Sequence, residues 1–125
     1  MNGMLLAAGV TAAGVAVIHL VAGHADVVRP LLASTLAQVP KRTMHSVWHL
    51  VSADLVFAAA ALVYLGLVQP EGTRLVGLLL AAHFAAYAGV FLAITLTFDG
   101  SSRLFRLPQW LLLLPVAVLA LLGSV

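Results

Sequence analysis

Four long stretches without a charged side chain, interrupted only by Asp54, restrict what this chain can fold into. They cover residues 4–23, 43–68, 75–98 and 107–125. A helix of about 20 residues crosses the roughly 30 Å hydrocarbon core of a bilayer. Backbone groups find no water in lipid, so spanning segments form helices, and the alternation of a β-barrel strand is absent. The sequence therefore predicts an all-α integral membrane protein, a bundle of four transmembrane helices.

The composition agrees with a single membrane domain. Of the 125 residues, 63% are hydrophobic and 8% are charged, whereas roughly a quarter of a soluble domain is charged. Four spans use most of residues 1–125, which leaves no room for a soluble domain. The absence of cysteine excludes disulfides, thiolate nucleophiles and cysteine-bound metal centres. The basic side chains lie beside apolar spans, so we expect the lipid bilayer, and no nucleic acid, as a partner.

The segment between the first two spans has a different character. From His24 to Arg42 it is bounded by charges, and its apolar run is too short to cross a membrane. Pro30 suits the first turn of a helix and Pro40 suits a stop. We therefore expect a short helix lying in the membrane interface between spans one and two.

The basic residues are unevenly divided between the two ends of the predicted spans. One end has only Arg74 and the amino terminus. The other end has five basic side chains: Arg29, Lys41, Arg42, Arg103 and Arg106. Because basic residues gather on the cytoplasmic side, this second end is predicted to be cytoplasmic. The sequence thus predicts a multi-pass protein of a bacterial-type inner membrane, with both termini outside.

Four histidines are predicted to gather toward the cytoplasmic side. At 1.5 Å per residue, His19 and His49 both lie roughly 9–10 Å from the bilayer centre, and His24 and His45 lie about one turn higher, at the surface. His45 and His49 are four residues apart and share a helix face. Imidazole is a common metal ligand, so the pattern predicts a candidate site for Zn, Cu or Fe, with Asp26 as a further ligand.

Two alternatives to this metal site stay open. His19 and His49 could hold a haem as its two axial ligands. Each imidazole could instead simply bond a neighbouring carbonyl or hydroxyl.

Three polar side chains are predicted deep in the bilayer. Asp54 lies near the centre, Tyr87 lies close to the same level, and His83 lies one turn from Tyr87 on the same face. A network of the three would satisfy groups that lipid cannot. It would either carry protons and bind a polar substrate group, or hold helices together.

Two further patterns indicate contacts with lipid and between helices. Arg29, Lys41 and Arg42 are candidates for binding a lipid headgroup, or they only anchor and orient the chain. Small residues recur at every fourth position of the third span, which predicts a packing face, unless a helix so rich in alanine produces the pattern by chance. These small residues are Gly77, Ala81, Ala85, Gly89 and Ala93.

The stretch from His19 to His49 resembles a group of small, uncharacterised four-helix bacterial inner-membrane proteins. The resemblance rests on His19, on the run Arg29-Pro30-Leu31-Leu32 and on Trp48-His49. In those proteins a histidine ends helix one and a Trp-His pair opens helix two. The resemblance implies a four-helix fold and transfers no activity.

Three functional hypotheses follow from these patterns. The first is a histidine-lined pocket at the cytoplasmic side that binds a metal or a polar, lipid-like ligand. If the protein is an enzyme, His19 and His49 would hold the metal or act as acid and base. The second is an accessory subunit of a larger membrane complex, and the third is a small proton-coupled carrier that uses Asp54 and His83. A carrier of this size would work as a homo-oligomer.

Overall fold

The computed structural model describes residues 1–125 and is entirely helical apart from turns and loops. The elements are α1 (Gly3–Ile18), the π-helix η1 (His19–Val28), α2 (Arg29–Ala33), α3 (Gln38–Val68), α4 (Thr73–Thr95), the 3₁₀ turn η2 (Arg103–Phe105) and α5 (Gln109–Leu122). Three continuous helices, 3–33, 38–68 and 73–95, are long and apolar enough to cross a membrane, and α5 is a shorter apolar helix of 14 residues. The predicted all-α class is confirmed.

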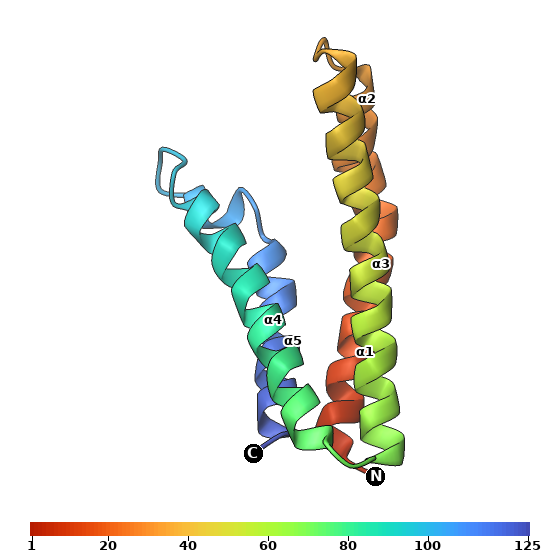
Figure 1. Ribbon diagram of the computed structural model, residues 1–125. Coiled ribbons are helices and arrows are strands. Elements are labelled where there is room, and N and C mark those ends of the chain that lie inside the picture. The colour runs from red at the N-terminus through yellow and green to blue at the C-terminus, as the bar shows by residue number, and fades with distance from the viewer.

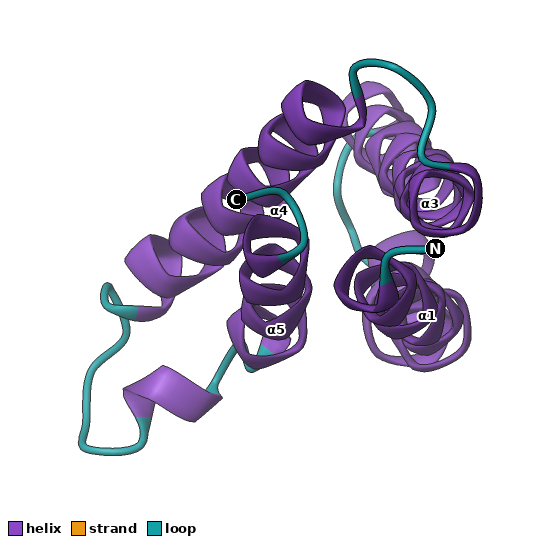
Figure 2. Ribbon diagram, turned by 90° about the horizontal axis from the view of Figure 1, so that it is seen from below, coloured by secondary structure: helices purple, strands orange, loops and turns teal.

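The helices form two hairpins arranged as a V (Figure 1). The first hairpin consists of α1, η1 and α2 packed along α3, and the second consists of α4 packed along α5. The hairpins meet at the end that holds both chain termini and the α3–α4 turn, here called the closed end, and they diverge toward the open end. Seen from the closed end, α1 lies between α3 and α5 (Figure 2). Although α3 and α4 are consecutive, they make few direct contacts.

Asn2 ties three helices together at the closed end. Its side-chain oxygen accepts hydrogen bonds from the first backbone N–H groups of α1, at 3.2 Å and 3.1 Å, as an N-cap residue does. Its side-chain nitrogen donates to the carbonyl of Gly123 after α5, at 2.7 Å. Its backbone nitrogen donates to the carbonyl of Gly66 in α3, also at 2.7 Å. The start of α1 is therefore fixed to both hairpins.

Glycines allow the backbones to approach closely at this end. A methyl group on Gly66 would lie 2.6 Å from the backbone nitrogen of Leu6, and one on Gly9 would lie 2.6 Å from the backbone nitrogen of Val63. A methyl group on Gly123 would lie 2.9 Å from the backbone nitrogen of Leu5. Backbone atoms cannot move aside as a flexible side chain can, so only glycine fits at these positions.

The packing face of α4 differs from the predicted ridge of small residues. Gly77 and Ala81 are buried as predicted, but the three later members, Ala85, Gly89 and Ala93, are exposed. The buried face continues instead through Phe84 and Ala88. Four helical residues turn the chain by more than one full turn, so a strict spacing of four rotates off the contact face after two steps.

The first helix is longer than expected, and the structure has no separate interfacial helix. It continues from α1 through η1 and α2 to Ala33, and α3 begins at Gln38, so only a short loop joins them. Each of these two helices has 31 residues, or roughly 46 Å at 1.5 Å per residue, which exceeds the hydrocarbon core. Residues 24–33 remain helical because they continue to pack along α3.

Substitution of Gly66 by alanine tests whether the close approach of backbones at the closed end stabilises the fold. The added methyl group collides with the backbone of Leu6, so we expect Gly66→Ala to lower the free energy of unfolding by about 1–3 kcal/mol. Gly89→Ala is the matched control, because nothing lies within 4 Å of a methyl group there, and alanine favours the helix by about 0.5–1 kcal/mol. Unfolding in mixed detergent micelles measures both. Equal effects would show that close approach at Gly66 does not stabilise the fold.

Candidate functional site

A cavity of about 580 Å³ lies between the two hairpins. Its walls come from both hairpins, including α1, η1 and α3 of the first and α4 and α5 of the second. Most of its 20 lining residues are hydrophobic. The few polar groups in the lining are His19, Asp26, Trp48, Tyr87 and Gln109. It is therefore an apolar space with a small number of places where a polar group can bind.

His19 is held in one orientation at the wall of this cavity. Its Nε2 lies 2.9 Å from the hydroxyl oxygen of Ser52, and that hydroxyl donates to the carbonyl of Trp48 at 2.9 Å. The hydroxyl therefore accepts from Nε2–H, which leaves Nδ1 of a neutral imidazole as an acceptor. The His19 ring also stacks on Trp48, with the ring centroids 4.7 Å apart.

Two polar atoms of the cavity lining are buried without a hydrogen-bond partner. They are Nε1 of Trp48 on α3 and Oε1 of Gln109 at the start of α5. Leaving a buried polar group unsatisfied costs about 1–3 kcal/mol, and native structures rarely do so without a water or ligand to satisfy it. One atom is a donor and the other an acceptor, and they come from different hairpins. Both side chains belong to the cavity lining, so a small rotation of either one would bring its unpaired atom to a polar group bound there.

The four histidines expected at the metal site divide between two places. His19 lines the cavity, and the ring of His24 lies edge-on to Trp48 at 6.2 Å. His45 and His49 lie outside the cavity and face each other, with their Nε2 atoms 3.2 Å apart.

The structure does not assemble the expected metal centre, because it contains no group of three histidines or carboxylates placed to bind one ion. The physical reason is the direction of the side chains. Consecutive residues on a helix point about 100° apart, so when Trp48 faces His19, His49 points elsewhere. A haem held between His19 and His49 is disfavoured for the same reason.

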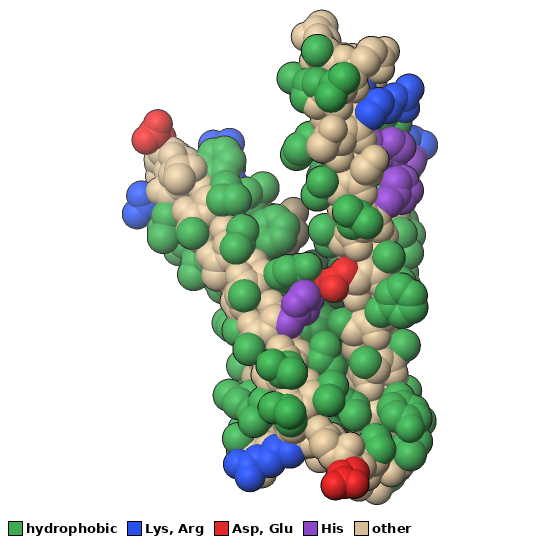
Figure 3. Space-filling view, viewed as in Figure 1, with side chains coloured by type: hydrophobic (Ala, Val, Ile, Leu, Met, Phe, Trp, Pro, Cys, Tyr) green, Lys and Arg blue, Asp and Glu red, His purple; other side chains and the backbone are tan.

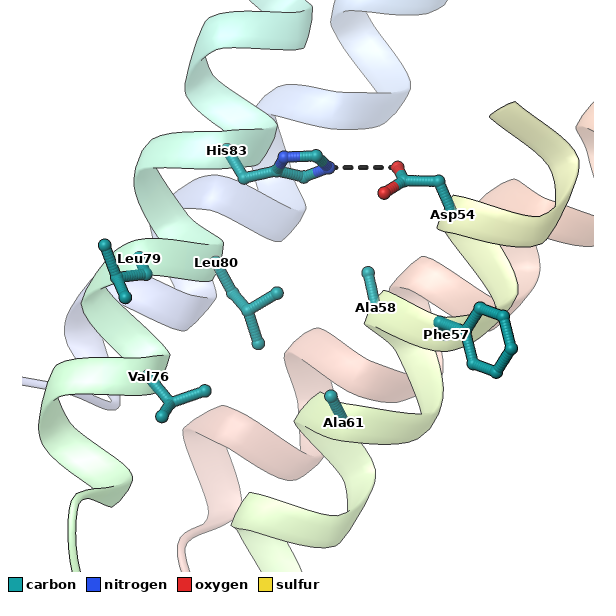
Figure 4. Close-up of a pocket in the computed structure, with 8 residues that line it drawn as sticks. All are labelled: Asp54, Phe57, Ala58, Ala61, Val76, Leu79, Leu80 and His83. Atoms are coloured by element: carbon teal, nitrogen blue, oxygen red, sulfur yellow. Dashed lines mark hydrogen bonds and ion pairs between the residues drawn. The ribbon is translucent and has the colours of Figure 1, made fainter. Parts of the chain in front are cut away.

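Asp54 and His83 meet across the gap between α3 and α4. The Nε2 of His83 lies 3.0 Å from the Oδ2 of Asp54 (Figure 4), and each side chain is about one-third exposed, at 31% and 36% respectively. The Tyr87 ring packs against His83 at 4.3 Å. This hydrogen bond joins α3 to α4, and the Tyr87 side chain of α4 also interacts with Asp54. The space-filling view shows an acidic and a histidine side chain side by side in the groove between the two hairpins (Figure 3).

A smaller cavity of about 390 Å³ lies on the closed-end side of this pair. Apart from Asp54 and His83, its lining is apolar, and it includes Ala58, Ala61 and Leu80 (Figure 4). The lining therefore offers no further polar group that a substrate could bind beside Asp54 and His83. The arrangement fits a hydrogen bond that links the two hairpins.

The basic side chains near the open end have two different surroundings. The ammonium group of Lys41 donates to the carbonyls of Leu32 and Ser34, at 3.3 Å and 2.6 Å, and so stabilises the end of the first helix. Arg29 and Arg42 are exposed and remain available to lipid headgroups. The proposed headgroup role therefore concerns the two arginines more than the lysine.

Reasoning from the sequence missed two residues of the cavity lining, Trp48 and Gln109, and also Ser52, which bonds to His19 at the cavity wall. Trp48 was noted only beside His49 in the resemblance and was not considered as a binding residue. Ser52 lies four residues after Trp48, and therefore on the same helix face. Gln109 is an amide at the beginning of an otherwise apolar helix, which is a detectable signal of a polar contact.

No protein-family model, curated protein sequence or solved structure matches this chain.

A double-mutant cycle tests the link between the hairpins. Asp54→Ala and His83→Ala should together destabilise the protein by less than the sum of their separate effects, because each removes the same contact. Side-chain hydrogen bonds between membrane helices contribute about 0.6 kcal/mol on average and up to about 1.7 kcal/mol, so we expect a coupling energy in that range. The measurement is unfolding of the four proteins in detergent micelles. A coupling energy of zero would mean that the two side chains act independently.

Proposed function

We propose that this protein binds an amphipathic, lipid-like molecule in the cavity between its two hairpins. The observation that carries the proposal is the unpaired donor and acceptor, Trp48 Nε1 and Gln109 Oε1, in the lining of an otherwise apolar cavity. At about 580 Å³ the cavity falls within the range of small-molecule sites.

The polar groups favour a neutral head group with a hydroxyl. A hydroxyl can accept a hydrogen bond from a donor such as Trp48 Nε1 or donate one to an acceptor such as Gln109 Oε1. A second acceptor, Nδ1 of His19, comes from the first hairpin. It is free to accept because Nε2 of the same ring donates to Ser52. The carboxylate of Asp26 in the lining disfavours an anionic head group. The surrounding hydrophobic side chains would contact the hydrocarbon part of the ligand.

We further propose that α5 is a fourth span and that both termini lie outside a bacterial-type inner membrane. Both termini lie at the closed end (Figure 1), and Asn2 is bonded to the carbonyl of Gly123. A chain whose two ends lie on the same side of a membrane crosses it an even number of times, so three long helices need a fourth crossing. Five of the six basic residues belong to the segments near the open end, which supports a cytoplasmic open end.

Single cysteines test this topology without background labelling, because the chain has no cysteine of its own. We expect a membrane-impermeant maleimide added to intact cells to label Glu71→Cys and Val125→Cys. It should label Thr35→Cys and Ser102→Cys only after the membrane is opened. Labelling of Val125→Cys only in opened membranes would show that α5 does not cross. Labelling of Thr35→Cys in intact cells would show that the protein has the opposite orientation in the membrane.

Quenching of Trp48 fluorescence tests the proposed ligand. In a Trp110→Phe background, Trp48 is the only tryptophan. A long-chain alcohol brominated on its chain should quench it saturably. Gln109→Leu should weaken binding by about tenfold, because it removes a hydrogen bond worth about 1–1.5 kcal/mol. Gln38→Leu, at an exposed position outside the cavity, should have no effect.

Filling the cavity provides the second arm of this experiment. Ala22 lines the cavity and Ala25 does not, although both are exposed residues of η1. Ala22→Phe should therefore abolish saturable quenching, and Ala25→Phe should preserve it. Quenching that rises linearly and equally in both variants would indicate unspecific contact with surrounding lipid, and the proposal would then be wrong.

A further inference from the structure

A pair of histidines on α3 lies outside the lipid-binding cavity and has no role in it. The Nε2 atoms of His45 and His49 are 3.2 Å apart, and the ring centroids are 4.8 Å apart. The two residues are one helical turn apart, so their side chains leave α3 on the same face. Both rings thus direct the same nitrogen toward one point beside the helix.

This separation suits two ligands of one metal ion. Imidazole nitrogens bind zinc at about 2.0–2.1 Å, so two of them in a tetrahedral site lie roughly 3.3–3.4 Å apart. The observed Nε2–Nε2 distance of 3.2 Å requires little movement to reach that arrangement. Without an ion, the pair can make only one hydrogen bond between the two rings.

Neighbouring aromatic rings hold the pair in place. The ring of His49 lies edge-on to Trp48, with centroids 5.0 Å apart and planes 82° apart. Trp48 is itself stacked on His19 of the first helix, so the orientation of His49 is supported from the neighbouring helix. Rings fixed in this way lose less freedom when they bind an ion.

The pair also lies on the outer surface of the protein. His49 is exposed and His45 is partly exposed. Both lie within about 10 Å of Arg42 along α3, at 1.5 Å per residue. The space-filling view shows histidine side chains gathered beside basic ones on the outer edge of the α3 arm (Figure 3). His45 lies one turn nearer Arg42 than His49 does, so an ion that arrives from the predicted cytoplasmic side reaches His45 first.

We propose that His45 and His49 form a two-histidine site for a divalent transition-metal ion, with water in the remaining coordination positions. The site uses neither the inter-hairpin cavity nor the ligand proposed for it. Among first-row divalent ions, Cu²⁺ binds nitrogen ligands most tightly, and Zn²⁺ also accepts imidazole. Cu²⁺ is therefore the probe for the site.

The fluorescence of Trp48 reports metal binding directly, since its ring lies 5.0 Å from that of His49. Cu²⁺ is titrated into untagged Trp110→Phe protein in detergent micelles while Trp48 fluorescence is followed. We expect quenching that saturates at one ion per chain and is reversed by a large excess of Zn²⁺, which binds the same ligands more weakly. His45→Ala and His49→Ala should each weaken Cu²⁺ binding by at least about tenfold, because the advantage of two linked ligands is lost.

His24→Ala is the matched control, because His24 also lies beside Trp48, at 6.2 Å, but on the other helix of the hairpin. This variant should bind Cu²⁺ as the parent does. Equal binding by the parent and His45→Ala would overturn the proposal, as would loss of binding in His24→Ala alone or no saturable quenching in the parent. His45→Gln and His49→Gln repeat the test with polar side chains, and unfolding curves confirm that each variant is folded.

Discussion

Backbone contact at glycine holds the closed end of this protein together, and the rest of the structure depends on it. Lipid offers helices no hydrophobic reason to associate, so close packing and hydrogen bonds must hold them. Gly9 and Gly66 let α1 and α3 touch, and Gly123 lets the end of α5 reach Leu5. Asn2 adds hydrogen bonds to α3 and to the end of α5. Because these contacts are concentrated at one end, the hairpins can diverge at the other.

The divergence of the hairpins creates the space in which the proposed ligand binds. The Asp54–His83 hydrogen bond joins α3 of the first hairpin to α4 of the second. It lies between the smaller cavity and the open end. Further toward the open end, the arms supply complementary polar atoms, Trp48 Nε1 from the first and Gln109 Oε1 from the second. A ligand bonded to both atoms would connect the hairpins where the protein itself does not. Ligand binding and the spacing of the arms are therefore expected to depend on each other.

Trp48 separates the histidines into two groups with different chemistry. The depth of a residue in the bilayer was estimated from the helical rise alone, and this estimate put His19 and His49 near the same level. Direction around the helix depends on how α3 is rotated, which a spacing pattern does not reveal. In the structure Trp48 faces the first helix, stacks on His19 and leaves His49 outside the cavity. Grouping the four histidines into one metal centre did not take this rotation into account.

The sequence by itself determined the helical class, the apolar segments and the uneven distribution of basic residues, because these follow from hydrophobicity and charge along the chain. It also identified Asp54, His83 and Tyr87 as neighbours by level. Only the tertiary structure decided that the first helix continues to Ala33, that the packing face of α4 turns away from Ala85, and that Trp48 and Gln109 line one cavity. These features depend on how each helix is rotated and on where the backbones touch. Both result from contacts between residues far apart in the sequence.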